Sequence, residues 1–280
     1  MTSEKTVLIT GTSSGIGLAT AIGAARAGWS VAATMRDTGK ADALLKAAAE
    51  NDVADHIQVK RLDVADPESI ATCLDEVIAE HGRLDALVNN AGAGHLGTLE
   101  QESVQDVRAV MEVNFFGVLN VTKAVLPLLR ASKGRVVTVT SVGGVIGQPF
   151  NEAYCAAKFA VEGFMESLAP VAATAGVAVS VVEPGAVASE FVSNVGGRDA
   201  ALEQAGPYAP ALSAYLARSR DAFAAAQTPQ GAAASIVELL ETDQPAFRVQ
   251  TSEAARAFTA VKLNDGDGSA VQTLTRAWIA

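Results

Sequence analysis

The stretch Thr6–Gly17, TVLITGTSSGIG, joins a short apolar run to three glycines and then to a helical pattern. An apolar run rich in β-branched residues favours a buried strand. Gly11, Gly15 and Gly17 let the backbone turn tightly and approach a ligand, and the N-terminus of a helix attracts phosphate. Glycines also serve as plain turn residues, but here they stand between a strand and a helix, as a phosphate-binding loop requires. The stretch therefore predicts a pyrophosphate site where the first strand ends.

The rest of the chain repeats this alternation of strand and helix. Strand-like runs lie at Thr6–Thr10, Ser30–Met35, Ile57–Val64, Leu84–Asn89, Arg135–Thr140, Val177–Val182 and Ala246–Gln250. Helical patterns lie at Ile16–Ala27, Ala41–Glu50, Pro67–His81, Ser103–Leu129, Glu152–Ala173 and Gln230–Glu241. Continuous apolar strands that alternate with helices indicate a parallel sheet covered on both faces. We predict an α/β fold with a doubly wound parallel sheet of about seven strands, whose ligands bind beyond the carboxyl ends of the strands.

Composition excludes several classes of function. The chain has 280 residues, 49% of them apolar, and a net charge of −10 without a basic run, which argues against nucleic acid or an anionic membrane as a partner. Cys73 and Cys155 form no CxxC pair, and His56, His81 and His95 lack ligand spacing, so we expect neither a disulfide framework nor a metal. No secretory signal and no membrane-length apolar run is found, so we expect a cytoplasmic protein without a membrane span.

The regular alternation breaks after Gly185. We expect a single domain over residues 1–280, in which residues 190–228 form a substrate lid and residues 251–280 a C-terminal extension. The cluster NDGDGS at Asn264–Ser269 predicts a turn. Pro170 falls inside a helical pattern, where it removes a backbone hydrogen bond and should kink or end the helix.

A tyrosine and a lysine stand four residues apart in Asn151–Ala160, NEAYCAAKFA. On a helix, Tyr154 and Lys158 would be neighbours, and an ammonium near a phenol lowers the pKa of the phenol from about 10. In isolation, the pair has an ordinary interpretation as a surface tyrosine beside a solvated lysine. The other motifs of the chain decide between the two.

The glycine spacing together with Tyr-xxx-Lys resembles the short-chain dehydrogenase/reductase family. The family's other motifs follow in order: Asn89-Asn90-Ala91-Gly92 after the fourth strand, Asn114 in the next helix, Ser141 after the fifth strand and Pro184-Gly185 after the sixth. The resemblance covers nearly all of the first 190 residues. It implies a Rossmann-like sheet and an enzyme that oxidises alcohols or reduces carbonyl groups.

The resemblance assigns catalysis to four residues. Tyr154 would be the acid/base at the reacting oxygen, and its pKa would need lowering by several units to work near neutral pH. Lys158 would contribute to that lowering and hold the nicotinamide ribose, and Ser141 would orient the reacting oxygen. Asn114 would hold a water that links Lys158 to solvent. Cys155 is interpreted as a packed residue rather than a nucleophile.

The resemblance also implies a dinucleotide site. The residues expected to bind the cofactor are Gly11, Ser13, Ser14, Gly15, Ile16, Gly17, Arg36, Asp63, Val64, Asn90, Ala91, Gly92, Tyr154, Lys158, Pro184, Gly185 and Val187. NAD-dependent members have an acidic residue where Met35 stands, whereas Arg36 can bind a 2′-phosphate. Asp37 argues mildly for NAD(H), but we favour NADP(H).

The segments VAATMRD, AVEGFMESLA and SAYLARSRDAF resemble the hydroxysteroid and retinol dehydrogenase branch. That implies a bulky apolar alcohol or ketone as substrate, and Tyr208–Phe223 would either line its pocket or cover the sheet. A β-ketoacyl thioester reductase and a nucleotide-sensing regulator without chemistry remain alternatives. His95 either faces the substrate or is a loop residue. The resemblance of Ser103–Leu129 and Glu152–Ala173 to the family's interface helices implies a homodimer or homotetramer.

Overall fold

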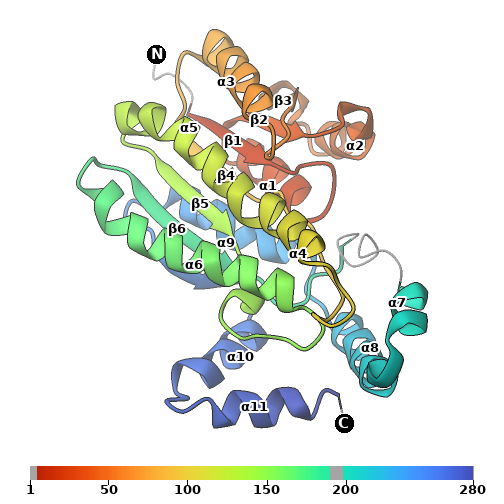
Figure 1. The fold of residues 1–280 in the computed structure, drawn as a ribbon. Coiled ribbons are helices and arrows are strands. Elements are labelled where there is room, and N and C mark those ends of the chain that lie inside the picture. Colours follow the sequence, from red (N-terminus) through yellow and green to blue (C-terminus); the bar gives the residue numbers. More distant parts are fainter. Residues whose placement is uncertain (1–4, 190–197, 280) are drawn as a thin grey trace.

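A computed structural model describes residues 5–189 and 198–279. Seven strands form one parallel sheet in the order β3-β2-β1-β4-β5-β6-β7 (Figure 1). The strands are β1 (Thr6–Thr10), β2 (Ser30–Met35), β3 (Ile57–Arg61), β4 (Ala86–Asn89), β5 (Arg135–Val139), β6 (Ala178–Glu183) and β7 (Arg248–Gln250). The predicted α/β fold with a doubly wound parallel sheet is confirmed.

The third strand ends three residues earlier than predicted. β3 stops at Arg61, and Leu62 donates one further hydrogen bond to Met35 O at 3.0 Å. The Asp63 carboxylate then accepts a hydrogen bond from Ala65 N at 3.0 Å. A side chain that bonds the backbone two residues on stabilises a turn. The chain therefore leaves the sheet before Val64.

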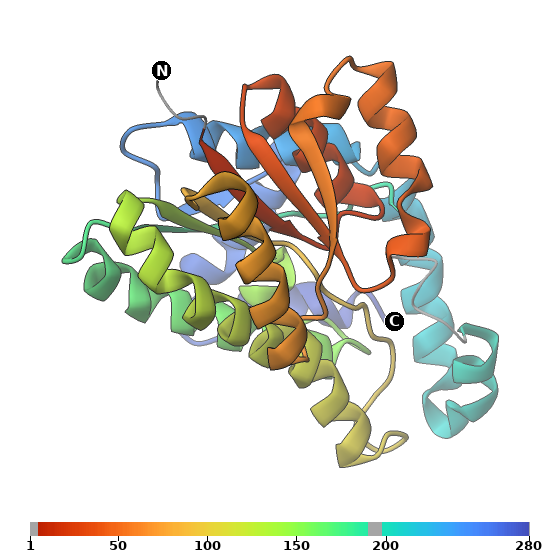
Figure 2. The same cartoon turned by 90° about the horizontal axis from the view of Figure 1, so that it is seen from above.

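Helices cover both faces of the sheet (Figure 2). One face carries α1 (Gly15–Arg26), α2 (Asp42–Glu50) and α9 (Pro229–Glu241), and the other carries α3 (Pro67–His81), α4 (Val104–Met111), α5 (Gly117–Ser132) and α6 (Glu152–Ala173). Successive strand residues point to opposite faces. Accordingly, Val7 and Ile9 pack with Ile236, whereas Leu8 packs with Val121 and Met165. The two apolar cores hold the carboxyl ends of the strands at one edge.

The predicted helix Ser103–Leu129 is interrupted by a π-helical segment. α4 begins with a capping box at Ser103 and ends at Met111, and the π-helix Glu112–Phe116 joins it to α5. The whole segment Val104–Ser132 is long and apolar enough to cross a membrane, a property that it shares with the core helices of globular proteins. In this fold its residues Val121 and Val125 are fully buried against the sheet.

Pro170 does not end α6, which continues to Ala173. The helix finishes within one turn of the proline, so the missing backbone N–H affects only its last turn. Pro170 therefore does not end the helix, and the alternative that it kinks the helix stays a prediction.

Beyond the sheet lie α7 (Arg198–Gln204), α8 (Ala209–Ala224), α10 (Glu253–Leu263) and α11 (Ser269–Arg276), as Figure 1 shows. Of the predicted lid, residues 190–197 lie outside the described residues, and the remainder contains α7 and α8. The predicted turn joins α10 to α11 and is stabilised by Asp265, which accepts a hydrogen bond from Val271 N at 2.9 Å. Trp278 connects α10 and α8, because it stacks on Phe258 at 5.6 Å and lies 4.4 Å from the Arg218 guanidinium.

Candidate active site

The strand order reverses between β1 and β4, because the chain moves from β1 outward to β3 and then crosses to β4. Open parallel sheets bind ligands at such a point, beyond the carboxyl ends of the strands. The residues that follow the six strand ends there include Gly11, Arg36, Asp63, Asn90, Ser141 and Pro184. The fold thus brings the glycine loop, the Asn-Ala-Gly motif, Ser141 and Pro184 to one edge of the sheet.

The glycine loop allows close backbone packing at this edge. Gly11 has a φ of +72° and Gly15 a φ of +57°, a region that side chains other than glycine rarely adopt. A Cβ on Gly17 would lie 2.1 Å from Gly11 O and 2.4 Å from Asn90 Nδ2. Such distances exclude any side chain at position 17. The loop can therefore hold its shape only with these glycines.

Substitution of Gly17 by alanine should lower the free energy of unfolding by about 3 kcal/mol and weaken dinucleotide binding at least about tenfold. The physical reason is that the new methyl group must displace the rigid backbone of Gly11. Urea unfolding and a binding titration measure the two effects. Gly163→Ala is the matched control, because a Cβ there meets nothing within 4 Å and alanine favours a helix. Wild-type dinucleotide affinity in Gly17→Ala would contradict the assignment.

The Asn-Ala-Gly motif after β4 locks the glycine loop in place. Thr10 Oγ1 accepts hydrogen bonds from Asn90 N and Ala91 N, both at 2.9 Å. The Asn90 side chain donates to Thr10 O and Gly11 O, again at 2.9 Å. A Cβ on Gly92 would meet Asn114 Oδ1 at 2.9 Å and Lys158 Nζ at 3.7 Å. The motif therefore connects the glycine loop to the predicted catalytic residues.

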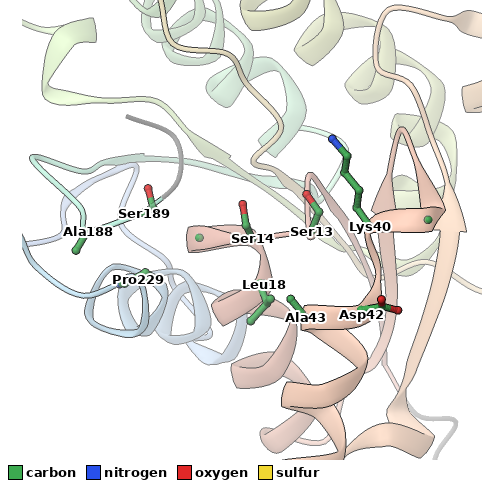
Figure 3. Close-up of a pocket in the computed structure, with 11 residues that line it drawn as sticks. Ser13, Ser14, Leu18, Lys40, Asp42, Ala43, Ala188, Ser189 and Pro229 are labelled. Atoms are coloured by element: carbon green, nitrogen blue, oxygen red, sulfur yellow. The ribbon is translucent and has the colours of Figure 1, made fainter. Parts of the chain in front are cut away.

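A cavity of about 860 Å³ opens beside the start of α1 (Figure 3). Its lining residues are Ser13, Ser14, Gly15, Leu18, Gly39, Lys40, Asp42, Ala43, Ala188, Ser189 and Pro229. Ser14 is the N-cap of α1 but bonds none of its N–H groups through the side chain, and the described first turn holds no acidic residue. A helix N-terminus left in this state favours an anion. Together with the glycine loop, the cavity fits the phosphates of a dinucleotide.

Several residues of this cavity were not predicted. Lys40 lines the same cavity as Ser13 (Figure 3). Ser189 packs so close to the loop that a Cβ on Gly15 would lie 3.2 Å from its Cβ. A basic residue four positions after Arg36 is a signal that could have identified Lys40. Nothing in the local pattern of Ser189 points to Gly15, because the two meet only in the folded chain.

Of the predicted cofactor residues, Ser13, Ser14 and Gly15 line the cavity, and the others are not among its lining residues. Ile16 belongs to the first turn of α1, and Val64 packs against Gly117. Pro184 O accepts a hydrogen bond from Val142 N at 3.0 Å. After Gly185, Val187 pairs with Gln227 in a short parallel bridge.

Arg36 and Asp37 differ in their surroundings. Both are exposed in the turn after β2. The Asp37 carboxylate accepts a hydrogen bond from Gly39 N at 3.0 Å and so caps the short helix that carries Lys40. Arg36 makes no ion pair with another described residue, since none of the ion pairs found among them includes it. The acidic residue is thus engaged in the turn, while the guanidinium faces solvent.

Ser141 and Tyr154 form a pair at the end of β5. Ser141 caps the short helix Val142–Gly144 through a 3.0 Å hydrogen bond from Gly143 N, and its hydroxyl also bonds the Tyr154 phenol. A Cβ on Gly143 would lie 3.3 Å from Ser141 Oγ and 3.4 Å from Tyr154 Cε1. A glycine at this position leaves room for both side chains. The two hydroxyl groups can therefore contact the same oxygen atom of a substrate.

Lys158 is buried on the same face of α6, with 4% of its surface exposed. Its Nζ lies 5.8 Å from the centre of the Tyr154 ring and donates to Val139 O at 3.1 Å. Burial lowers the pKa of Lys158 from 10.5 to about 8, although the negative charge of Glu162 opposes this. The spacing of four residues thus places the amine near the phenol, as predicted from the sequence.

The pKa of Tyr154 differs from the expected direction. Burial raises it from 10.0 to about 12, because an apolar environment disfavours the phenolate, and the hydrogen bond with Ser141 offsets only part of this. Lys158 donates to a backbone carbonyl instead of the phenol oxygen. In the absence of a bound ligand, Tyr154 is therefore a protonated phenol at neutral pH, ready to donate a proton.

Asn114 is fully buried in the π-helical segment. Its Nδ2 donates to Ala93 O at 3.0 Å and Val110 O at 3.1 Å, and its Oδ1 accepts from Ala93 N at 3.2 Å. The amide therefore fixes the backbone that follows Gly92. Its predicted part in a water relay stays a prediction.

Two further residues, Cys155 and His95, make contacts that stabilise the fold. Cys155 is buried, and burial raises the pKa of its thiol to about 11, which disfavours the nucleophilic thiolate. His95 is partly buried and pairs with Glu102 at 2.5 Å. A Cβ on Gly97 would overlap the Glu102 carboxylate, at 1.6 Å. The histidine thus belongs to a folded loop beside the site.

The chain is similar to known proteins both in its sequence and in its fold. The family model for short chain dehydrogenases matches residues 5–199. Retinol dehydrogenase 8 of Bos taurus is 41% identical over 95% of this chain and 87% of its own length. The 17-beta-hydroxysteroid dehydrogenase type 1 of Homo sapiens is 38% identical over 94% of this chain and 82% of its own length. A short-chain dehydrogenase from Streptomyces avermitilis superimposes with a TM-score of 0.77 at 32% identity, covering 99% of this chain and 98% of that chain.

These matches agree with the glycine loop, the Asn-Ala-Gly motif and the pairing of Ser141 with Tyr154 beside Lys158. The chain therefore belongs to the short-chain dehydrogenase/reductase family, in its hydroxysteroid and retinol dehydrogenase branch, and is an oxidoreductase that acts on CH–OH groups and binds a nicotinamide dinucleotide.

Proposed function

We propose that this enzyme uses NADP(H) to interconvert a bulky apolar ketone or aldehyde and its alcohol. The observation that carries the proposal is the hydrogen-bonded pair of Ser141 and Tyr154 beside Lys158, at the edge that also holds the glycine loop. A bound nicotinamide supplies or accepts the hydride. Catalysis by the protein then reduces to orienting one oxygen atom and moving one proton.

The roles of the side chains follow from their chemistry. In reduction, the Tyr154 phenol donates its proton to the carbonyl oxygen, while the Ser141 hydroxyl donates a hydrogen bond to the same oxygen. In oxidation, Tyr154 must first lose its proton, which its pKa of about 12 opposes at neutral pH. The positive charges of Lys158 and of an oxidised nicotinamide would favour that loss.

An apolar cluster beside the catalytic residues supports a bulky apolar substrate. It consists of Phe150, Leu212 and Ala205, with Leu96, Ala201, Leu202, Ala209, Ala211, Tyr215, Leu216 and Ile279 packed against them. Tyr215 OH accepts a 2.7 Å hydrogen bond from Asn151 Nδ2, only three residues before Tyr154. α8 therefore packs on the loops around the site rather than on the two cores of the sheet. This favours a pocket-lining role for Tyr208–Phe223.

The names of the relatives point to retinol and to 17-beta-hydroxysteroids as substrates of those proteins. We infer a substrate of similar size and polarity for this chain. The test is a screen of steroid ketones, retinal and acetoacetyl thioesters with NADPH and NADH, followed by nicotinamide absorbance. Turnover of the thioester alone would favour a β-ketoacyl thioester reductase, and binding of a dinucleotide without any turnover would favour the regulator.

NADP(H) preference rests on two exposed cations. Arg36 and Lys40 follow β2, where the adenosine ribose of a dinucleotide binds in this fold, and Asp37 is held in the turn. We predict that Arg36→Ala or Lys40→Ala weakens NADPH binding about tenfold and leaves NADH binding unchanged. Fluorescence titration of both dinucleotides measures this. Lys46→Ala, at an exposed ion pair on α2, is the control, and equal losses for both dinucleotides would contradict the preference.

Reduction should depend on pH through Lys158. Its pKa of about 8 lies below the value of 10.5 in an unfolded chain, so its charge is present below about pH 8 and lost above it. Tyr154 keeps its proton over this range. We therefore expect kcat/KM for ketone reduction to be constant in the neutral range and to fall above about pH 8. A pH profile that rises through this region would contradict the role of the ammonium.

The long helices α5 and α6 support a homodimer or homotetramer, because Phe116, Phe159 and Phe164 are exposed on this layer. Sedimentation of the purified protein tests this, and a monomer would contradict it.

A cytoplasmic location without a membrane span stays a proposal from the sequence, and fractionation of cells tests it.

A further inference from the structure

Glu162 is a buried carboxylate that the proposed chemistry leaves without a role. It lies on α6 one turn after Lys158, which itself lies one turn after Tyr154, so the three occupy one face of the helix. Only 4% of its surface is exposed. A buried charge is costly unless other groups bond or neutralise it, so the partners of Glu162 call for an explanation.

Glu162 contacts the backbone segment that carries Ser141 on both sides. Thr140 Oγ1 donates a short hydrogen bond to Glu162 Oε1, and Thr140 immediately precedes Ser141. Beyond Ser141, a Cβ on Gly144 would lie 3.0 Å from Glu162 Cγ. The carboxylate thus packs beneath the turn that positions the Ser141 hydroxyl. A displacement of Glu162 would therefore displace the turn that carries Ser141.

On its other side Glu162 pairs with Arg248 of β7. Arg248 Nη2 lies 3.0 Å from Glu162 Oε2 and 3.2 Å from the exposed Glu166 Oε2. Arg248 Nε lies 2.7 Å from Glu183 Oε1, and the other oxygen of Glu183 accepts from Gln250 Nε2 at 2.8 Å. Glu183 is fully buried and directly precedes Pro184. The network therefore ties α6 to the ends of β5, β6 and β7.

The charges of this network balance only when Lys158 is included. Burial raises the pKa of both Glu162 and Glu183, and the Thr140 and Arg248 contacts of Glu162 act against this. When both carboxylates are ionised they carry two negative charges, and Arg248 and Lys158 carry two positive ones. Glu166 adds a further negative charge, but 64% of its side chain is exposed and solvent screens it. Glu162 is the carboxylate on the helical turn next to Lys158 and acts to raise its pKa.

We propose that Glu162 is a positioning residue of the reaction: its carboxylate keeps Lys158 charged and fixes the turn that carries Ser141, while Arg248 keeps Glu162 ionised. The catalytic part of this inference rests on the proposed function, whereas the electrostatic part concerns the protein alone. The Glu162 carboxylate contacts Thr140 and Arg248, and we infer that it acts on the reaction through Thr140 and Lys158.

The electrostatic part predicts shifts of opposite sign in two variants. Glu162→Gln removes a negative charge and should lower the pKa of Lys158 by about one unit, whereas Arg248→Gln removes a positive charge and should raise it. Glu166→Gln is the matched control, because it removes an exposed carboxylate that pairs with the same arginine, and should change the pKa by less than about 0.3 units. Carbon-13 NMR of protein labelled at its lysine residues measures the pKa of Lys158 in all three variants. The Lys158 signal is the one that is missing from the spectrum of Lys158→Met.

The catalytic part concerns the pH above which kcat/KM falls. That pH should be about one unit lower in Glu162→Gln than in the wild type and unchanged in Glu166→Gln. Equal shifts of this pH in Glu162→Gln and Glu166→Gln, or an unchanged pKa of Lys158 in Glu162→Gln, would overturn the inference. Glutamine keeps the size of the side chain, so failure of Glu162→Gln to fold would also overturn it in favour of a purely structural role. If the wild type reduces no carbonyl compound, the proposed function fails, and the NMR titration still decides the inference.

Discussion

Replacement of Tyr154 by phenylalanine should lower kcat about 10³-fold and leave dinucleotide affinity near that of the wild type. In the proposed reaction the phenol beside Ser141 is the proton donor, and its pKa of about 12 keeps it protonated. Phenylalanine fills the same space, and the glycine loop is held by Thr10 and Asn90 instead. Steady-state kinetics and a dinucleotide titration measure the two quantities.

The matched control for this variant is Tyr208→Phe. That phenol is exposed and donates to Glu100 Oε2 at 2.6 Å, outside the catalytic cluster. It should keep the wild-type kcat, whereas its KM can change, because Tyr208 begins the segment that we propose to line the substrate pocket. If Tyr154→Phe and Tyr208→Phe have equal kcat values, the phenol of Tyr154 is not the proton donor.

Replacement of Lys158 by methionine should abolish most activity and at the same time stabilise the fold. The amine is buried, and burial lowers its pKa from 10.5 to about 8, so the folded protein carries a buried charge at neutral pH. At about 1.4 kcal/mol per pKa unit, removal of that charge should raise the free energy of unfolding by about 1 to 3 kcal/mol near pH 7. Loss of the bond to Val139 O reduces the gain.

The sign of the pH dependence provides a check on this prediction. Between about pH 8 and 10.5 the unfolded chain holds the Lys158 proton more tightly than the folded protein does, so the wild type gains stability as pH rises. The methionine variant lacks this contribution, and its advantage should shrink across that window. Urea unfolding at neutral and alkaline pH measures the difference. A variant that is less stable than the wild type near pH 7 would show that the ammonium stabilises the fold.

The sequence predicts the sheet and its functional edge well, because both depend on local patterns. Apolar runs of five or six residues alternate with amphipathic helices, and turn residues mark the end of each strand. The predicted end of a strand is furthest from the observed one at β3, where the turn stabilised by Asp63 follows a strand that ends at Arg61. α10 and α11 were not predicted, and each buries few residues: Ala255 and Thr259 in α10, Val271 and Thr275 in α11.

Features that depend on burial or on distant parts of the chain could not be derived in the same way. The spacing of Tyr154 and Lys158 shows that they are neighbours, but not that burial raises one pKa and lowers the other. Lys40 meets the glycine loop, and Glu162 meets Arg248, only after the sheet has formed. Burial and charge pairs between distant segments therefore determine the pKa values of Tyr154 and Lys158, which the spacing of the motif alone does not give.

The central claim is that hydride moves between a dinucleotide at this edge and a carbon atom whose oxygen contacts Tyr154. Its most direct test uses NADPH that carries deuterium at the transferable position of the nicotinamide, with a steroid ketone as acceptor and mass spectrometry of the alcohol. We predict that the wild type transfers the label to the carbinol carbon and that Tyr154→Phe, although it binds NADPH, does so about 10³-fold more slowly. Binding of NADPH by the wild type without label in any alcohol of the ketone and retinal panel would contradict the claim.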